Sequence, residues 1–527
     1  MSPGRLRAPT AGQAASFDRF AIRERGVPEP ALMENAGRQA ALVIQHLYGS
    51  GPVVALLGSG NNGGDALVCL RALAAWGRPV TAVAVGQRPD SDPVLHGWDL
   101  PTVEFDPSEG DGGALRRLLG SAGVVVDGLL GTGIRGAPRA GYAAAIEAAN
   151  RTGGGALVAL DTPSGVDGTS GKVPGASIRA SLTIAFGWPK LGTLLHPGRA
   201  RCGRIVAVEI GFPPGETVNG EDWAELVTTG WAAERLPRRP PVTHKNAVGT
   251  LAVVAGSAMA GAAVLAARAA FRAGAGLVRV CSSRLAGDAI VQVPEAVFVD
   301  AAEADGLRDA VRASDAVAVG PGLGTGDEAV RQLEAVLAAR GGRPVVVDAD
   351  ALTLFARGAL GGISALEGTG AVVTPHPGEM SRLTGRSVAE IQADRVGTAR
   401  SFAAAHGVVT LLKGAPSLVA DPDGRLLVSA TEHTSALAVA GMGDVLAGAA
   451  ASFLAQGVDP VDACGLALDI TGRAVAESGL GASLTPSDVV EGMGAALPGL
   501  AGRAAHPYPL NTDLPFPFVT FDQASPR

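Results

Sequence analysis

The chain has 527 residues, of which 47% are hydrophobic and 18% are charged, and its formal net charge is −7. Such a composition is typical of a folded protein, and the length predicts more than one domain of about 100–200 residues. The acidic balance and the absence of a long basic block argue against a nucleic-acid partner. No apolar stretch reaches the roughly 18 uninterrupted residues of a membrane span, and the N-terminus lacks the apolar segment of a signal peptide.

The four cysteines lie far apart and form no CxxC pair: Cys69, Cys202, Cys281 and Cys464. This spacing is typical of reduced thiols in a cytosolic protein and not of a disulfide framework or a zinc site. We therefore expect a soluble, cytoplasmic protein with no membrane partner.

Short apolar runs alternate with Ala-rich segments along the first half of the chain. Strands are expected at 52–58, 79–85, 123–127, 156–161 and 182–186, and helices at 64–76 and 141–150. Continuous apolar strands separated by amphipathic helices predict a parallel sheet that is covered on both faces, which is the doubly wound α/β pattern.

Residues 211–243 lose this periodicity and contain several prolines, so we expect an inter-domain connection there. A second α/β series follows, with strands expected at 250–255, 276–280, 316–319, 344–348, 371–374 and 408–412. The proline-rich residues after 505 predict an irregular tail. Because the two halves do not repeat each other's motifs, we expect two different α/β domains.

A turn rich in glycine and asparagine, GSGNNGGD at 58–65, joins the first expected strand to its helix. Glycines permit a tight turn, and the N–H groups at a helix N-terminus attract phosphate. Asparagine side chains add carbonyl oxygens that suit a hard cation or a ligand amide. Alone, a turn of this kind could be nothing more than a turn.

Two acids end further strands of the first half, Asp127 before GLLGTGIRG and Asp161 before TPSGVDG. Ligands of open α/β sheets bind beyond the carboxyl ends of the strands, so three polar turns in such positions predict one shared crevice. Each acid by itself could equally be a helix N-cap. Lys190, in FGWPKLG, could contact a phosphate or could be a solvated surface lysine.

The second half carries the motif Gly441-Met442-Gly443-Asp444 before an Ala-rich helix expected at 445–456. Small residues at a helix start expose unpaired N–H groups to an anion, and an aspartate beside them can accept a proton during phosphoryl transfer. Asp444 could alternatively be an ordinary helix cap. Four more strand ends carry polar turns, at 320–324 (GPGLG), 348–352 (DADAL), 374–379 (TPHPGE) and 412–414 (LKG).

The order and spacing of these motifs resemble a known family. Residues 17–37 with GSGNNGGD, VDGLLGTGIRG, DTPSGVDG and FGWPKLG resemble NAD(P)H-hydrate epimerases over about 12–228. HKNAVGTLAVVAGS, GPGLG, VDADAL, TPHPGEM, LLKGA and GMGDVLAG resemble the dehydratase domain of the same repair family over about 235–500. The resemblance implies two different three-layer α/β/α domains, a Rossmann-like epimerase domain (1–228) and a ribokinase-like dehydratase domain (229–505), with a Pro-rich tail (506–527).

For the epimerase domain, the resemblance implies a potassium ion bound by Asn62, Asp127 and Ser164. It implies substrate contacts from Asn61, Asn62, Gly63, Gly64, Asp65, Gly131, Thr132, Gly133, Ile134, Arg135, Gly136, Ala137 and Asp161. Inversion at C6 of the hydrated nicotinamide ring can proceed through an iminium. This route needs an acid–base group near the hydroxyl and a site that tolerates transient positive charge. A carboxylate suits both demands. Asp161 is the first candidate and Asp65 the second.

For the dehydratase domain, the resemblance implies that ADP or ATP phosphorylates the C6 hydroxyl of the S hydrate and that loss of phosphate regenerates the dihydropyridine. Asp444 would be the base. The hydrate would contact Ala262, Gly322, His376 and Asp444, and the nucleotide Lys413, Gly414, Ala415, Pro416, Ser417 and Gly443. Mg²⁺ is expected with the phosphates, with Asp350 and Glu379 as candidate partners through water. The substrates would be NADHX or NADPHX with ADP or ATP, and a homo-oligomer is expected.

The sequence departs from the family pattern at three places that bear on adenine and ribose contacts. GSAMAGAA (256–263) is short and lacks a tyrosine, residues 431–434 read Thr-Glu-His-Thr, and KGAPS (413–417) lacks a common threonine. Two other functions stay open: a small-alcohol kinase of the ribokinase type, and a non-catalytic nucleotide-binding scaffold. A kinase would not explain the NNGGD domain, and a scaffold would not need Asp65, Asp161 and Asp444.

Overall fold

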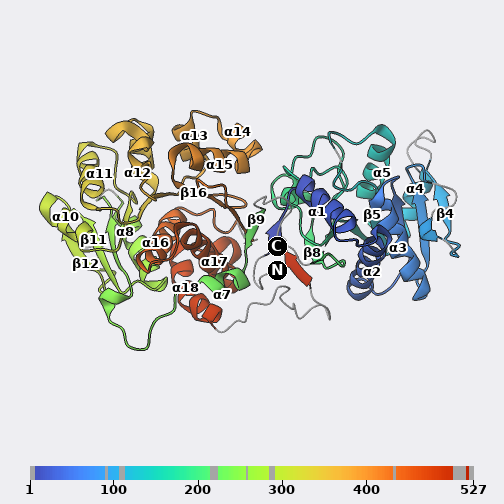
Figure 1. The fold of residues 1–527 in the computed structure, drawn as a ribbon, viewed down its shortest axis with the longest axis horizontal. Helices are drawn as coiled ribbons and strands as arrows, with labels where there is room; N and C mark the ends of the chain where they lie inside the picture. Colours follow the sequence, from blue (N-terminus) through green and yellow to red (C-terminus); the bar gives the residue numbers. More distant parts are fainter. Residues whose placement is uncertain are drawn as a thin grey trace. The chain divides into compact units, whose positions relative to one another are not determined.

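The computed structural model describes residues 6–88, 93–95, 97–105, 113–133, 135–213, 223–256, 259–283, 291–430, 435–501 and 518–521. The chain forms two compact units. The first comprises the residues up to Ala224 together with strand β19, and the second begins at Glu225. Each unit has a sheet with helices packed against it (Figure 1).

The sheet of the first unit is parallel except at one edge. Its spatial order is β19 (Phe518–Phe521), β8 (Arg204–Val208), β7 (Leu182–Phe186), β6 (Ala156–Leu160), β5 (Val124–Gly128), β2 (Val53–Leu57), β3 (Val80–Ala84) and β4 (Thr102–Glu104). Only β19 pairs antiparallel, with β8. The order reverses beside β2, where β3 lies on one side and β5 on the other. Such a reversal is where open α/β sheets bind ligands.

Helices cover both faces of this sheet because its strands are apolar on both sides. Val53, Ala55 and Leu57 of β2 belong to one buried cluster, whereas Val54 and Leu56 belong to another, as the alternation of side chains along a strand requires. The helices are α1 (Ala11–Arg23), α2 (Glu29–Leu47), α3 (Asn61–Ala75), α4 (Gly113–Gly120), α5 (Ala140–Arg151) and α6 (Leu191–Leu194), and a two-residue strand, β1 (Arg7–Ala8), precedes them.

The second unit has a longer, mixed sheet. Its strands follow the order β9 (Ala224–Val227), β18 (Leu426–Ser429), β17 (Leu418–Ala420), β16 (Val409–Leu412), β15 (Val372–Val373), β14 (Val345–Val347), β13 (Ala316–Val319), β10 (Thr250–Val254), β11 (Leu277–Ser282) and β12 (Val297–Asp300). The strands from β16 to β12 pair in parallel, while β17 pairs antiparallel with both β16 and β18.

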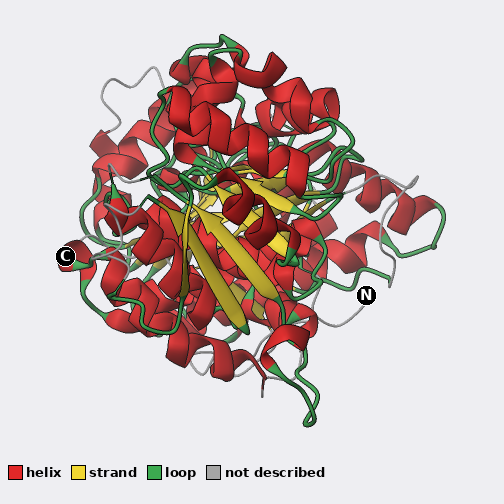
Figure 2. Cartoon of the chain, turned by 90° about the vertical axis from the view of Figure 1, so that its left-hand side faces the viewer, coloured by secondary structure: helices red, strands yellow, loops and turns green. Residues whose placement is uncertain are grey.

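Figure 2, turned toward the second unit, shows helices on both sides of the strands. They are α7 (Thr229–Arg235), α8 (Ala260–Arg272), α10 (Ala304–Arg312), α11 (Asp327–Ala339), α12 (Ala349–Ala356), α13 (Pro377–Thr384), α14 (Val388–Ala393), α15 (Arg395–His406), α16 (Met442–Ala455), α17 (Pro460–Ser478) and α18 (Pro486–Ala501). Both units are therefore α/β/α sandwiches of different strand order, as the sequence predicts.

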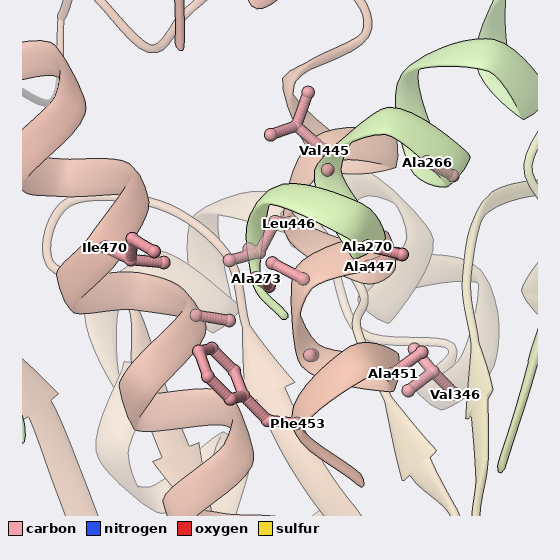
Figure 3. Close-up of a cluster of buried hydrophobic side chains, with 14 of the residues drawn as sticks. Ala266, Ala270, Ala273, Val346, Val445, Leu446, Ala447, Ala451, Phe453 and Ile470 are labelled. Carbon is pink, nitrogen blue, oxygen red and sulfur yellow. The ribbon is translucent and has the colours of Figure 1, made fainter. Parts of the chain in front are cut away.

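The core of the second unit forms where α8 packs on α16 (Figure 3). The contact is made by alanines, so the two backbones come close, and the Ser452 hydroxyl donates a 2.9 Å hydrogen bond to the Ala270 carbonyl. A Cβ atom at Gly448 would lie 2.2 Å from the Ala266 carbonyl oxygen. Phe453 fills the space toward α17, near Ile470. This packing fixes the start of α16.

We expect Gly448→Ala to lower the free energy of unfolding of the second unit by roughly 2–3 kcal/mol. The added methyl meets backbone, which cannot move aside cheaply in a close-packed core. Gly261→Ala on α8 is the matched control, because nothing lies within 4 Å of its Cβ position and alanine favours helix. Urea unfolding followed by circular dichroism measures both, and equal midpoints for the two variants would contradict this packing.

The structure differs from the sequence-based expectation at two places. Within the expected connection 211–243, β9 and α7 are regular elements of the second unit, with β9 parallel to β18. Residues 518–521, expected to be irregular, form β19 along β8. Both strands lie at or near a sheet edge, where hydrogen bonding to a distant segment and not local periodicity creates the strand. None of the helices in the described part of the chain is both long and apolar enough to pass through a bilayer.

Candidate functional site

A cavity of about 750 Å³ opens at the carboxyl ends of β2, β5, β6 and β7. The sequence-predicted residues that line it are Asn61, Asn62, Asp65, Gly131, Thr132, Gly133, Arg135, Ala137 and Asp161. The three polar turns that the sequence singles out therefore meet in one cavity, because parallel neighbours end at the same edge of the sheet. Ile134 lies outside the described residues.

Asp161 is held in an unusual backbone conformation at this edge. Its φ is 61°, a left-handed value that is uncommon for a residue with a side chain. The carboxylate accepts a hydrogen bond from Lys190 Nζ, and the Phe186 N–H donates to it over 3.2 Å. Lys190 is only 4% exposed and also donates to the Phe186 carbonyl over 3.0 Å. Lys190 is therefore the buried partner of the candidate acid–base group, and the surface-lysine interpretation is wrong.

Asp65 and Asp18 line the same cavity as this pair. Burial, with the negative charges of Asp161 and Asp18, raises the pKa of Asp65 well above its ordinary value. Burial likewise raises the pKa of Asp18 to about 6, against the opposing effect of Lys190. Three carboxyl groups and one ammonium thus share the cavity, and burial makes two of the carboxyls, Asp18 and Asp65, easier to protonate than an ordinary aspartate.

Three glycines of the predicted cradle do not line the cavity. A Cβ at Gly63 would lie 2.2 Å from the Gly58 carbonyl oxygen, and one at Gly64 would lie 2.7 Å from the Met33 sulfur. Gly136 has a φ of 82°, which a residue with a side chain rarely adopts. Gly63 and Gly64 thus allow close packing at the start of α3, and Gly136 allows the turn of its loop. Substrate contacts of these glycines stay predictions.

The three residues expected to bind potassium come together beneath the cavity. Ser164 donates to Asp127 from its N–H over 2.8 Å and from its hydroxyl over 2.6 Å, and the Asn62 amide donates to the Leu130 carbonyl over 3.0 Å. Asp127 is fully buried, and burial raises its pKa to about 6 despite these hydrogen bonds. The Oδ1 atom of Asn62 is buried and accepts no hydrogen bond.

The second site forms around the first turn of α16. Gly441, with a φ of 95°, precedes the helix, and Met442, Gly443 and Asp444 form its first turn. The Met442 N–H donates to the Val439 carbonyl over 3.3 Å, which leaves the N–H groups of Gly443 and Asp444 to receive an anion. Burial raises the pKa of Asp444 to about 7, with Asp348 adding to the effect and Lys413 opposing it. A carboxylate with this pKa is well suited to accept a proton near neutral pH.

Lys413, predicted to contact the nucleotide, points into this carboxylate cluster. Its ammonium lies 2.7 Å from Asp348 Oδ1 and 3.7 Å from Glu379 Oε2. Burial alone would lower the pKa of Lys413, but the two carboxylates outweigh it and raise the pKa. A Cβ at Gly443 would lie 3.3 Å from the same ammonium and 3.6 Å from Asp348 Oδ2. The start of α16, the end of β14 and the end of β16 therefore meet within a few ångströms.

The rest of the predicted nucleotide loop is ordered by a buried arginine. Arg395 of α15 donates from Nη2 to the carbonyls of Leu412, Lys413 and Pro416 over 3.2, 3.1 and 2.9 Å. Gly414 and Ser417 close the turn, with a 3.2 Å bond from the Gly414 N–H to the Ser417 hydroxyl. Ala415 lies within this turn. The loop is thus held from behind, which leaves its other side for a ligand.

His376 is the N-cap of α13. Its Nδ1 accepts from the N–H groups of Gly378 and Glu379 over 3.0 and 3.3 Å, and Glu379 returns a bond to the His376 N–H. The side chain is 51% exposed, so its role as a helix cap leaves Nε2 available for the predicted ligand contact. Burial lowers its pKa, so the imidazole is predominantly neutral near pH 7.

The remaining predicted positions, Gly322, Ala262 and Asp350, shape the backbone around the second site. Gly322 has a φ of 58°, and a Cβ there would lie 2.7 Å from the Met259 carbonyl oxygen. Ala262, in α8, is 4% exposed. Asp350 accepts from the Gly324 N–H over 2.8 Å, which ties the GPGLG turn to α12. Substrate contacts of Ala262 and Gly322 stay predictions.

Sequence reasoning did not single out Asp18 or Asp348. Both lie inside motifs that were noted, Asp18 in the 17–37 segment and Asp348 at the start of DADAL, but no spacing rule pairs them with partners 172 or 65 positions away. Residues 257–258 and 431–434, two of the departures from the family pattern, lie outside the described residues. Within the described ranges no group of three or more His, Cys, Asp or Glu residues has the arrangement of a metal site.

Two family models match the chain. Residues 29–192 match the YjeF-related protein N-terminus, and residues 251–487 match NAD(P)H-hydrate dehydratase. Curated bifunctional NAD(P)H-hydrate repair enzymes are similar over most of their length. That of Moorella thermoacetica is 35% identical, covering 88% of this chain and 91% of the relative. That of Escherichia coli is 36% identical, covering 82% of each.

Among solved structures, the ADP/ATP-dependent NAD(P)H-hydrate dehydratase of Bacillus subtilis co-crystallised with ATP and Mg²⁺ is 27% identical. It aligns with a TM-score of 0.45, covering 52% of this chain and 98% of that structure. The two full-length relatives span both units and both sites described above. With both family models and these relatives in agreement, the chain belongs to the family of bifunctional NAD(P)H-hydrate repair enzymes.

Proposed function

We propose that this chain repairs hydrated nicotinamide nucleotides, its first unit interconverting the R and S hydrates of NAD(P)H and its second unit dehydrating the S hydrate at the expense of ADP or ATP. The observation that carries the proposal is the presence, in one chain of this family, of two unlike sites. One is a cavity with three carboxyls and a lysine. The other is a helix start with a carboxylate base and a buried lysine.

For dehydration, the C6 hydroxyl oxygen attacks the terminal phosphorus of the nucleotide, and Asp444 accepts the proton of that hydroxyl. The N–H groups at the start of α16 stabilise the charge on the transferring phosphoryl group. Lys413, held by Asp348, supplies a fixed positive charge beside that group. Phosphate is then a good leaving group, and the lone pair of the ring nitrogen expels it. Mg²⁺ bound with the nucleotide would neutralise phosphate charge, and Asp350 and Glu379, whose charges act on Asp444, are the candidate partners of its water shell.

For epimerisation, the C6–O bond breaks with its electron pair on oxygen, and water returns from the other face. Asp161, which lines the cavity, moves a proton during this exchange of hydroxyl and water. Lys190 holds its carboxylate in position through a buried ion pair. The negative charges of the cavity stabilise the iminium that forms between the two steps.

A potassium ion fits among the oxygen atoms of Asn62, Asp127 and Ser164. Asp127 is a fully buried carboxylate, and no cationic side chain in the described ranges forms an ion pair with it. Burying a charge without such compensation is costly. Asn62 Oδ1 is a buried oxygen without a donor. Together with the Ser164 hydroxyl, these oxygens are the hard ligands that an alkali cation prefers. Such an ion would fix the two loops that line the cavity.

The melting temperature of the first unit is expected to be several degrees higher in KCl than in choline chloride of equal ionic strength. Binding to the folded state alone adds about 1.4 to 2.7 kcal/mol at concentrations ten- to a hundredfold above Kd. Calorimetric melting curves in KCl and in choline chloride measure the difference. Asp127→Asn should abolish it, whereas Glu147→Gln on the exposed face of α5 should retain it. The same potassium response in Asp127→Asn would remove this site from the proposal.

The proposal is tested by incubating the purified chain with an R/S mixture of hydrated NADH, Mg²⁺, K⁺ and either ADP or ATP. Absorbance of reduced nicotinamide reports the product. Complete recovery supports both activities, and recovery that stops at the S fraction supports the dehydratase alone. No recovery with either nucleotide would contradict the proposal and return attention to a small-alcohol kinase, tested with thiazole and pyrimidine alcohols, or to a nucleotide-binding scaffold.

A cytoplasmic location and a homo-oligomeric state belong to the same proposal. All four cysteines are free and buried, and burial raises the pKa of Cys69 to about 12, so they are unreactive thiols and not disulfide partners. Proteins with buried reduced thiols are typical of the reducing cytosol.

A further inference from the structure

Helix α1 is anchored against the segment that carries Lys190. Phe17 is fully buried in an aromatic cluster, with ring centroids 5.0 Å from Trp188 and 5.3 Å from Phe212 in edge-on contact. The N–H of Leu191 donates to the carbonyl of Pro9, just before α1, over 2.8 Å. Trp188 and Leu191 flank Lys190, so α1 and the lysine are fixed relative to each other. This helix precedes residues 29–192, over which the N-terminal family model matches.

Asp18 follows the anchor residue directly and lines the cavity with Asp65, Asp161 and Lys190. Its position is therefore set by the burial of its neighbour and not by a flexible loop. Burial raises its pKa to about 6. The other charged groups that act on it are, in decreasing order, Lys190, Asp161, Arg19 and Glu29, and Asp18 in turn raises the pKa of Asp65.

Asp161 is in a different electrostatic situation from Asp18. It accepts hydrogen bonds from the Lys190 ammonium and from the Phe186 N–H. Asp18 shares the cavity, but no donor of the described part of the chain hydrogen-bonds to its carboxyl. Two carboxyls with such different partners can take different roles in proton transfer, which is what an acid–base pair requires.

Inversion at C6 needs two proton transfers on opposite faces of the ring. A hydroxyl must leave from one face as water, and a water must lose a proton as it adds to the other face. One carboxyl on one side cannot readily serve both faces in a single turnover. The anchored position of Asp18 on the wall formed by α1, apart from the strand edge that carries Asp161, supplies a second group.

We propose that Asp18 is the second acid–base group of the epimerase site, which rests on the epimerase function proposed above. Protonated Asp18 donates to the departing C6 oxygen, the C–O bond breaks with its electron pair on oxygen, and the ring-nitrogen lone pair forms the iminium. Water then attacks C6 from the other face, the nitrogen regains its pair, and Asp161 accepts the proton. Exchange with solvent restores both carboxyls, and the reverse reaction uses them in exchanged roles.

The test is Asp18→Asn in the full-length chain, with R hydrate as substrate and no nucleotide. Chromatographic separation of R from S gives the rate after the enzyme-free rate at each pH is subtracted. We expect kcat to fall about a hundredfold or more, with KM changed less than threefold. Dehydration of S hydrate by the same chain is the folding control. Glu24→Gln, at the exposed C-terminal end of α1, should leave both activities unchanged.

The pH profile separates acid catalysis from a merely structural role. Because Asp18 must be protonated to donate, the wild-type rate should decline as pH rises through about 6, and Asp18→Asn should lack this decline. Asp18→Glu should recover part of the rate. Wild-type kcat in Asp18→Asn, or a raised KM with unchanged kcat, would overturn the assignment. A wild-type chain without epimerisation would overturn the proposed function itself, and the assignment with it.

Discussion

Asp444→Asn is expected to lower kcat for dehydration of the S hydrate by about a thousandfold or more, while ADP or ATP binds within a few-fold of the wild-type affinity. The amide keeps the size and position of the side chain but cannot accept the proton of the attacking hydroxyl. The N–H groups at the start of α16 and the Asp348–Lys413 pair remain in place to receive the phosphates. Single-turnover kinetics measure the chemical step, and isothermal calorimetry measures nucleotide binding.

The pH dependence of dehydration by the wild-type chain should show the titration of the Asp444 carboxyl. Burial and Asp348 raise the pKa of Asp444 to about 7, and a base acts only when it is unprotonated. The rate of dehydration should therefore increase with pH through about 7 and level off above it, and the residual rate of Asp444→Asn should lack this step. Epimerisation by the same variant is the internal control. Wild-type dehydration in Asp444→Asn would exclude this residue as the base.

Asp161→Asn is expected to suppress epimerisation by about a hundred- to ten-thousandfold and to leave dehydration of pure S hydrate intact. The substitution has a second effect, because it removes the partner of Lys190, which is 4% exposed. Leaving a buried ammonium unpaired costs roughly 3–5 kcal/mol. The first unit should therefore melt at a lower temperature in this variant.

The double variant Asp161→Asn with Lys190→Met separates chemistry from stability. Removing both charges should restore much of the lost stability, whereas epimerisation should stay suppressed. Calorimetric melting and the R-to-S conversion assay measure the two effects on the same preparations. Recovery of epimerisation together with stability would show that Asp161 only supports the fold. Loss of dehydration in Asp161→Asn would contradict the assignment of the two activities to separate units.

The sequence by itself determined the central strands and the turns that follow them. β2, β5, β6, β10 and β13 lie within two residues of the expected ranges. Each is a continuous run of buried aliphatic residues, and burial on both faces leaves this signature in the sequence regardless of the partner strand. The polar turns were visible for the same local reason, since a strand of buried residues must end where glycine, asparagine or aspartate begins.

Only the tertiary structure determined where the strands at or near the sheet edges form. β9 and β19 obtain their hydrogen bonds from segments far along the chain, so no local sequence pattern predicts them. The same holds for the partners of the catalytic candidates. The sequence leaves Lys190 open between a phosphate contact and a surface lysine, and only the structure shows its pairing with Asp161. The sequence predicts a nucleotide contact for Lys413, and only the structure shows Asp348 beside it.

Asp18 is the clearest case of this division. Its sequence neighbourhood is an ordinary amphipathic helix, and its ordinary pKa would leave it ionised at neutral pH. Burial of Phe17 among aromatic rings from 188 and 212 brings the helix to the cavity, and the resulting desolvation raises the pKa of the carboxyl. Sequence fixes which residues can be buried, but desolvation and charge pairing depend on what packs against them, and that is a property of the folded chain alone.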